Sequence, residues 1–543
     1  MCLKPIFFII FIFASFNKCH SIDTRVDPLV DTKVGLIRGL KAEDGDYSMF
    51  LGIPYGKVDE NNPFEPSLPH ENFQEIFEAY DDSAICPQIE EFNKTNTGSL
   101  DCLHLNIYVP DVASTKSPVP VLVWIHGGGF QIGFSGRFLY GPKYLVRHDI
   151  ILVTLNYRVG PYGYMCLDDQ KVPGNQGFKD QLLALRWIKD NIGSFGGNSN
   201  KITLFGESAG GRSVDYHLFS QQEKLFNSLI IQSGTSLLPT HIGEPESTRT
   251  LNLAAKLGFE TDDVNEALSF LTNQSPNSVI AAMQEIDRYL PCVENDYENV
   301  EKFISDYTFN LNIPKVKNVP ILIGHNDAER LPNHLNQNAD YFDNLNIFHD
   351  TFNSAFNFNS SELINVVNNF RHFYIGDEEI SEKELFNIID FDSDFTYVHA
   401  TQRSIKQYME NNAGDIFYYM FTYNGGRNFV KKRMNVTFGG AAHADEIGYL
   451  FDISYMKDEP SNEDQLVIDR MTTLWANFVK YSNPTPETSD LLPVEWRPVE
   501  DEKLYYLDIN NKLTLKKRPF NDRMAFWDLF YEYNHSLQKG YRN

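Results

Sequence analysis

Short, mostly apolar runs recur along the chain and alternate with segments of helical periodicity. Residues 121–125, 202–205 and 319–323 are such runs, and they lack the regular polar positions of a strand with one face in water. Runs of this kind are typical of strands buried on both faces of a parallel sheet. Residues 180–192 repeat apolar side chains at helical spacing, and we expect Gly193 to terminate this helix. The alternation predicts an α/β fold with a mostly parallel sheet.

The length of the chain, 543 residues, would suit several domains by the usual prior of roughly 100–200 residues each. However, the sequence contains no Gly/Ser-rich linker, low-complexity tract or internal repeat at which it could divide. We therefore expect one α/β domain over residues 22–543.

The formal net charge is −26, and the acidic residues are spread along the chain rather than gathered in blocks. A strongly negative surface repels phosphate backbones, so nucleic acid is not an expected partner. The charge is better explained as keeping a secreted protein soluble. Cysteine, histidine and carboxylate side chains do not cluster at metal-ligand spacing, so no metal or organic cofactor is expected.

The N-terminus has the composition of a secretory signal peptide. Lys4 precedes the apolar run 6–13, and the small side chains of Cys19 and Ser21 suit cleavage after residue 21. This run is shorter than the roughly 20 residues that a membrane span needs, and no other stretch qualifies. Because residues 533–543 are polar, no membrane or lipid anchor is expected. The sequence therefore predicts a secreted, extracellular protein.

The most informative motif follows the apolar run 202–205. Gly206, Glu207, Ser208, Ala209 and Gly210 place a serine between two glycines where a strand turns into a helix. A sharp turn of this kind pushes the serine hydroxyl clear of the backbone, and the flanking positions must be small for the neighbouring elements to close up. The pattern predicts a nucleophile elbow with Ser208 at its tip.

Three consecutive glycines, residues 127–129, follow the apolar run 121–125. A glycine triplet is also typical of a flexible turn, but its place upstream of a nucleophile elbow favours an oxyanion hole. We expect the N–H groups of Gly128, Gly129 and Ala209 to bind the developing oxyanion. Removing one such donor typically costs about 2.7–4 kcal/mol of transition-state stabilisation.

A serine nucleophile also needs a base and an acid that orients the base. In the order serine, acid, histidine, the acid should follow the strand 319–323, where Asp327 and Glu329 are equal candidates by spacing. The base candidate is His443, because it stands in a loop of small residues that can bring an imidazole to a site built elsewhere.

Together these motifs resemble the carboxylesterase and cholinesterase family, whose members carry a Glu-Ser-Ala elbow, a preceding oxyanion triplet and a His-x-Asp-Glu stretch. The resemblance implies an α/β-hydrolase fold over nearly the whole mature chain. It selects Glu329 over Asp327 as the acid and His443 as the base, so all three catalytic positions are occupied. It extends to residues 101–106, 156–160, 174–181 and 232–234.

Two arginines depart from the family pattern. Arg330 follows the acid where the family usually has glycine, and a positive φ there would strain an arginine backbone. Its charge could also compete with His443 for Glu329. Arg212 stands in the predicted helix after the elbow, where the family usually has a small residue, and we expect an ion pair with Asp215 one turn on.

Secretion makes disulfides possible, and the resemblance implies a Cys86–Cys102 bridge whose loop of about 15 residues is worth about 3 kcal/mol. Cys166 and Cys292 have no family pairing, so we expect free, buried thiols there. The candidate glycosylation sequons begin at Asn93, Asn273, Asn359, Asn435 and Asn534.

The resemblance implies a secreted serine hydrolase that cleaves carboxylic esters through an acyl-enzyme on Ser208, similar to arthropod esterases of hormones, semiochemicals or xenobiotics. Cholinesterases hold the choline cation on a tryptophan in the loop that the first disulfide closes. That loop has no tryptophan here and Phe92 is its only aromatic residue, which predicts neutral, apolar esters as substrates. The alternatives are a non-catalytic, cholinesterase-like binding or adhesion protein and a slow esterase that acts as a scavenger.

Overall fold

The computed structural model describes residues 27–237, 240 and 242–542, so the predicted signal peptide lies outside the described residues. Its centre is a sheet of eleven strands in the order β18-β17-β16-β15-β14-β13-β11-β12-β10-β4-β3. The strands are β3 Leu40–Lys41, β4 Tyr47–Pro54, β10 His104–Pro110, β11 Val119–Ile125, β12 Ile151–Leu155, β13 Gly197–Glu207, β14 Ser228–Gln232, β15 Ile321–Asn326, β16 Ile416–Phe421, β17 Tyr505–Ile509 and β18 Thr514–Lys517.

The middle of this sheet, from β12 to β17, is parallel throughout. Antiparallel pairs occur only toward its edges, between β18 and β17, β12 and β10, β10 and β4, and β4 and β3. The prediction of an α/β fold with a mostly parallel sheet is therefore confirmed.

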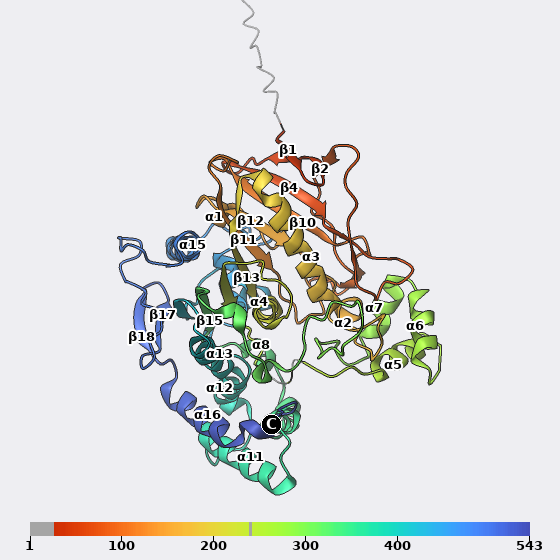
Figure 1. Cartoon of the computed structure of the whole chain (residues 1–543). Helices are drawn as coiled ribbons and strands as arrows, with labels where there is room; N and C mark the ends of the chain where they lie inside the picture. The colour runs from red at the N-terminus through yellow and green to blue at the C-terminus, as the bar shows by residue number, and fades with distance from the viewer. Residues whose placement is uncertain (1–26, 238–239, 241, 543) are drawn as a thin grey trace, which may run out of the picture.

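The central strands are apolar along their whole length because both faces of the sheet are covered. On β11, Val121, Val123 and Ile125 belong to one hydrophobic core, whereas Leu122 and Trp124 belong to the other. Helices α3 (Gln176–Asn191) and α4 (Ala209–Phe219) cover the first face, and α15 (Asn462–Tyr481) covers the second (Figure 1).

Helix α3 begins four residues before the expected helix and ends within one residue of the expected end. A 3₁₀ turn, Ile192–Phe195, continues the chain past Gly193, and the left-handed residue that ends it is Gly196, with φ 81°. The α-helix itself ends at Asn191 with Ile192 as its C-cap, so the expected stop at Gly193 is confirmed, and it is the 3₁₀ turn that the glycine with a positive φ terminates.

The C-terminal helices gather around an aromatic cluster of their own, at the bottom of Figure 1. Phe352, Phe370, Phe391 and Trp527 pack together there, with ring centroids 4.5–6.1 Å apart. The helices that contribute are α10 (Ile347–Ala355), α11 (Ser360–Ile375), α12 (Leu385–Ser393) and α16 (Asn521–Asn534). A π-helical stretch, Asp394–Val398, joins α12 to α13 (His399–Glu410).

Both cysteine pairs in the described chain are disulfides. Cys86–Cys102 forms as the family resemblance implies. Cys166 and Cys292 are also bonded, with Cα atoms 6.5 Å apart, so the expectation of free thiols is wrong. They stand 126 residues apart in the sequence, and only the fold brings their loops together across Gly174, whose backbone lies against both sulfurs.

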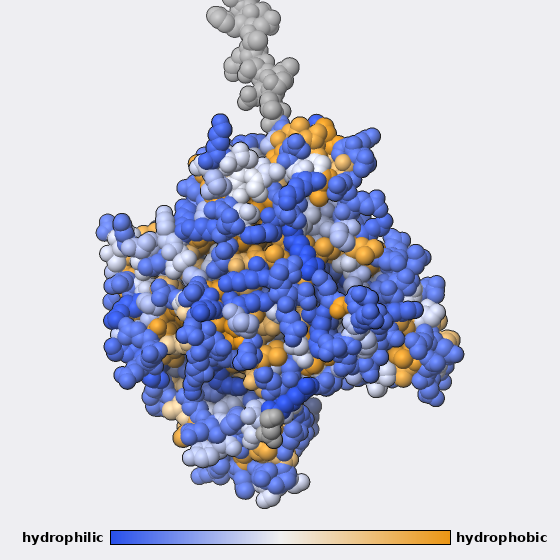
Figure 2. All heavy atoms as spheres, in the orientation of Figure 1, coloured by the Kyte–Doolittle hydropathy of each residue, from blue (hydrophilic) through white to orange (hydrophobic). Residues whose placement is uncertain are grey.

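The visible face of the molecule is mostly hydrophilic, with apolar side chains scattered over it (Figure 2). Within the described residues no helix combines the length and apolarity needed to cross a membrane.

Candidate active site

Ser208 lies at the corner between β13 and α4 with φ 57° and ψ −122°, a conformation that non-glycine residues rarely adopt. The two flanking glycines permit this turn. A Cβ on Gly206 would come within 2.4 Å of the backbone of Gly210, and one on Gly210 within 2.0 Å of the Ile125 carbonyl oxygen. The strained elbow thus requires the residue types that the motif supplies.

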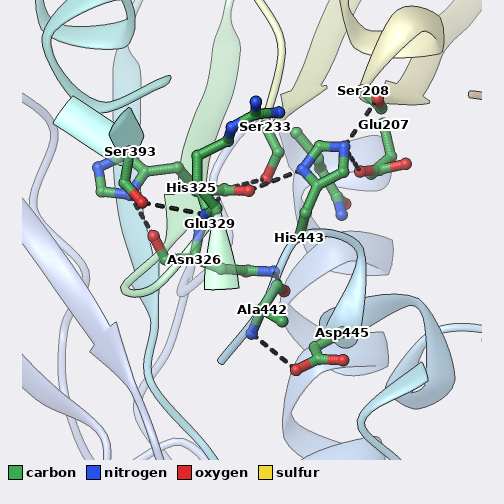
Figure 3. Close-up of polar contacts among 12 residues, drawn as sticks. Glu207, Ser208, Ser233, His325, Asn326, Glu329, Ser393, Ala442, His443 and Asp445 are labelled. Atoms are coloured by element: carbon green, nitrogen blue, oxygen red, sulfur yellow. Dashed lines mark hydrogen bonds and ion pairs between the residues drawn. The ribbon is translucent and has the colours of Figure 1, made fainter. Parts of the chain in front are cut away.

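The elbow presents Ser208 to His443, and His443 in turn to Glu329 (Figure 3). The Oγ of Ser208 lies 2.8 Å from Nε2 of His443, and Nδ1 of His443 lies 2.7 Å from Oε2 of Glu329. Because a carboxylate only accepts hydrogen bonds, Nδ1–H donates to Glu329 and leaves Nε2 to accept the serine hydroxyl proton.

Glu329 is fully buried at the end of β15 and remains able to carry a charge. Burial by itself would raise the pKa of its carboxyl, but hydrogen bonds from His443, from the Ser233 hydroxyl at 2.6 Å and from the Asn326 N–H at 2.7 Å lower it below the usual value. An ionised Glu329 therefore faces His443 at neutral pH.

The other acid candidate, Asp327, binds a backbone N–H and not His443. Its carboxylate accepts the Ala441 N–H at 2.6 Å and so ties the end of β15 to the loop that carries His443. His325 is buried against the Tyr418 hydroxyl at 2.6 Å, away from Ser208. The structure thus brings together Ser208, His443 and Glu329.

Asp445 holds the loop of small residues that carries His443 through hydrogen bonds to backbone N–H groups. Its buried carboxylate accepts N–H groups of Ala442, Val430 and Lys431 at 2.7–3.0 Å, and Figure 3 shows the contact with Ala442. Burial nevertheless raises the pKa of Asp445 to about 6. In addition, the His443 N–H donates to the Glu329 carbonyl oxygen at 3.1 Å, which aligns base and acid.

The candidate oxyanion donors adjoin this corner: Ala209 follows Ser208, and a Cβ on Gly127, next to Gly128, would come within 3.0 Å of the Ser208 Cβ. Gly128 and Gly129 have φ values of 108° and 62°, and a Cβ on Gly128 would come within 2.2 Å of the Ile132 carbonyl oxygen. Neither of their N–H groups, nor that of Ala209, donates a hydrogen bond to any described residue. Ser208, His443 and both glycines remain partly exposed, so a small molecule can reach them.

Glu207, the residue before Ser208, also lies at the site, although the elbow motif predicts no chemical role for it. Its Oε1 lies 3.2 Å from Nε2 of His443. Burial, aided by the charge of Glu329 and only partly offset by that of Arg212, raises the pKa of Glu207 well above its usual value. Burial thus disfavours a charge on Glu207, and the orienting nitrogen of His443, Nδ1, is bound by Glu329.

Arg330 does not disturb Glu329. Its φ is −91°, so the expected backbone strain is absent, because the chain turns there without entering the left-handed region. The guanidinium Nε donates to Asp392 at 2.8 Å, and this carboxylate also contacts His334 at 2.8 Å. Arg330 is held by Asp392, which corrects the expectation that it competes with His443.

The expected ion pair between Arg212 and Asp215 is also wrong. Asp215 instead accepts the Ser236 N–H at 2.7 Å and the Tyr408 hydroxyl at 2.6 Å. These two neutral donors come from segments distant in sequence, and they occupy the carboxylate oxygens that Arg212 would need.

Phe92, in the loop closed by Cys86–Cys102, packs its ring against Phe138 and Tyr455 at centroid distances of 5.5 Å. The guanidinium of Arg433 lies 6.0 Å from the same ring. Four of the sequon asparagines are exposed and the fifth, Asn534, is half-buried; the exposed ones are Asn93, Asn273, Asn359 and Asn435.

Comparison with known proteins gives consistent results. The profile of the carboxylesterase family matches residues 26–527. Esterase FE4 of Myzus persicae is 30% identical over 83% of each chain, and the juvenile hormone esterase of Heliothis virescens is 30% identical over 91% of this chain and 93% of its own. Mouse cholinesterase is 31% identical over 95% of this chain and 88% of its own.

Among solved structures, the juvenile hormone esterase of Manduca sexta, with OTFP covalently attached, superposes with a TM-score of 0.81. That structure is 26% identical in sequence, and the match covers 94% of this chain and all of the Manduca chain.

Proposed function

Because this chain belongs to the carboxylesterase family, we propose that it hydrolyses carboxylic esters through an acyl-enzyme formed on Ser208. The observation that carries this proposal is the continuous hydrogen-bonded series from Ser208 through His443 to Glu329, with distances of 2.8 and 2.7 Å. A serine, a neutral imidazole and a buried carboxylate in this order form the machinery of acyl transfer.

In the proposed mechanism, Nε2 of His443 takes the proton of Ser208 as Oγ bonds to the ester carbonyl carbon. The N–H groups of Gly128, Gly129 and Ala209 stabilise the oxyanion of the tetrahedral intermediate. His443 then gives its proton to the leaving alcohol, and the acyl group stays on Ser208. A water molecule repeats the sequence, releases the acid and restores the serine.

The enzyme is proposed to act outside the cell, as a single α/β-hydrolase domain over residues 22–543. Two disulfides favour an oxidising compartment, and the exposed sequon asparagines are accessible to glycosylation. The signal-like composition of residues 1–21 agrees with this proposal.

We further propose that neutral, apolar esters are better substrates than choline esters. The loop closed by Cys86–Cys102 offers no tryptophan to a quaternary ammonium group, and its only aromatic ring, Phe92, already faces the cation of Arg433. Arg433 is held there by an ion pair with Glu91, so a second cation would have to displace it from the ring.

The test compares kcat/KM for acetylcholine and phenyl acetate on the purified protein at physiological ionic strength. We expect phenyl acetate to have the higher value, with sustained turnover after the first catalytic cycle. A higher value for acetylcholine would overturn the substrate class. A single burst without further turnover would instead identify a scavenger, and no reaction at all would favour a binding protein.

A further inference from the structure

Arg212 is a buried cation for which the mechanism has no use. Only 5% of the residue is exposed, and its Nε is buried without a hydrogen-bond partner. Among the described residues, nothing forms a side-chain hydrogen bond or an ion pair with this guanidinium. An uncompensated charge in a protein interior is costly, so a buried arginine normally has an anionic or carbonyl partner.

The carboxylates near Arg212 do not neutralise it. Glu207 forms no ion pair with Arg212 among the described residues, and its Oε1 faces Nε2 of His443 at 3.2 Å. Glu329 is bound by His443, Ser233 and the Asn326 N–H, and Asp215 is bound by Ser236 and Tyr408. The other nearby cation, Arg330, has Asp392 as its partner, whereas Arg212 has none in the described chain.

Arg212 lies beside the reacting groups. It stands one helical turn after Ser208 on α4, where its N–H donates to the Ser208 carbonyl oxygen at 2.9 Å. Tyr397 is among the side chains near Arg212, and the Tyr397 ring lies 4.8 Å from the ring of His443. Tyr397 belongs to the π-helical stretch Asp394–Val398, a local irregularity that is frequent at functional sites.

We propose that Arg212 binds a carboxylate on the ester substrate, beside Tyr397 and the Ser208–His443 pair. A planar guanidinium with free donors suits a carboxylate, which accepts two parallel hydrogen bonds from it. Such a substrate would provide the anionic partner that Arg212 lacks among the described residues. The inference rests on the proposed ester hydrolysis at Ser208, and it extends the substrates from neutral apolar esters to apolar esters that carry one carboxylate.

The test compares pairs of esters that differ only by a methyl or a carboxylate group. On the acyl side, 4-nitrophenyl butanoate, pentanoate and hexanoate are paired with the 4-nitrophenyl monoesters of succinate, glutarate and adipate, respectively. On the alcohol side the pair is 4-methylphenyl acetate and 4-acetoxybenzoate. For each pair the charge ratio is kcat/KM of the carboxylate ester divided by that of its methyl partner, after subtraction of the non-enzymatic rate.

We expect Arg212→Met to lower the charge ratio about tenfold or more for at least one pair, because the methionine removes the donors but keeps an unbranched side chain. Arg212→Lys, which retains the charge without the planar fork, should lower it less. The matched control is Arg403→Met, since Arg403 is also an arginine beside a tyrosine, 4.0 Å from the Tyr531 ring. Its side-chain hydrogen bond goes to Gln538, and within the described chain it contacts neither Ser208 nor His443. Its charge ratios should stay within about twofold of those of the wild type.

The charge ratio is insensitive to the fraction of folded enzyme, so a partly destabilised variant still gives a result. If Arg212→Met is inactive, inhibition of the wild-type enzyme provides the test. At least one of the dicarboxylates succinate, glutarate and adipate should then inhibit hydrolysis of phenyl acetate more strongly than the matching monocarboxylate, which is butanoate, pentanoate or hexanoate. Unchanged charge ratios in Arg212→Met, or equal inhibition by both kinds of acid, would overturn the role of Arg212. Failure of the proposed function would look different, because no ester would then be hydrolysed.

Discussion

At the scale of single residues, function depends on which carboxylates are charged. Three donors lower the pKa of the buried Glu329, whereas Glu207 has no such donors among the described residues and burial raises its pKa. Both lie near His443, at 2.7 Å and 3.2 Å. The difference supports our proposal that Glu329 orients His443.

We predict that Glu329→Gln lowers kcat by about four orders of magnitude, the loss typical when the acid of such a triad becomes an amide. An amide N–H that donates to Nδ1 of His443 leaves the imidazole proton on Nε2, which then cannot accept the serine proton. Asp327→Asn should keep kcat within about tenfold of the wild type, because the amide oxygen still accepts the Ala441 N–H. Steady-state kinetics with phenyl acetate measures both. If Asp327→Asn shows the larger loss, the assignment of the acid is wrong.

The sequence locates the serine and the histidine but cannot separate the two acids by spacing. Asp327 and Glu329 are two positions apart, and what distinguishes them is burial and the donors that other segments bring. The same holds for Arg212, whose expected partner Asp215 is bound by Ser236 and Tyr408. Only the family resemblance selects Glu329 before the structure does.

At the scale of elements, buried side chains connect the sheet to the segment that carries the base. Glu446, in the 3₁₀ helix Asp445–Tyr449, accepts hydrogen bonds from Gln232 at the end of β14 and from Asn326 at the end of β15, both at 2.7 Å. Burial, together with the charges of nearby carboxylates, raises the pKa of Glu446 to about 8.

This raised pKa predicts a specific dependence of stability on pH. The folded protein holds the Glu446 proton up to about pH 8, whereas the unfolded chain releases it near pH 4.5, the ordinary pKa of a glutamate. Stability from this group is therefore complete below pH 4.5 and falls as the pH rises toward 8, by at most about 1.4 kcal/mol per pH unit. We expect Glu446→Gln to gain melting temperature relative to the wild type between pH 5 and pH 8. A difference that stays constant or shrinks over this range would contradict the prediction.

Elements buried on two faces were predictable from their continuous apolar runs, and β11, β13 and β15 lie at those runs. Features that depend on contacts between distant segments were not predictable from the sequence. The Cys166–Cys292 bridge and the π-helical stretch Asp394–Val398 leave no local pattern in the sequence. Likewise, the sequence does not show that a 3₁₀ turn, Ile192–Phe195, continues the chain after α3.

At the scale of the whole molecule, the net charge of −26 acts on any charged substrate before it reaches the site. Raising the ionic strength from 0.01 to 0.15 M shortens the Debye length from about 30 to about 8 Å. We therefore predict that salt lowers kcat/KM for acetylcholine, raises it for carboxylate esters and leaves phenyl acetate nearly unchanged. Stopped assays at several sodium chloride concentrations measure this. An equal change for all three esters would show that the surface charge has no steering role.

The central claim of this account is that Ser208 is the nucleophile. A fluorophosphonate probe, followed by intact-protein mass spectrometry and peptide mapping, tests it most directly, because only an activated serine reacts at neutral pH. We predict that the wild type gains one probe adduct on Ser208 and that Ser208→Ala gains none. A probe adduct on another serine, or labelling that persists in Ser208→Ala, would contradict the account.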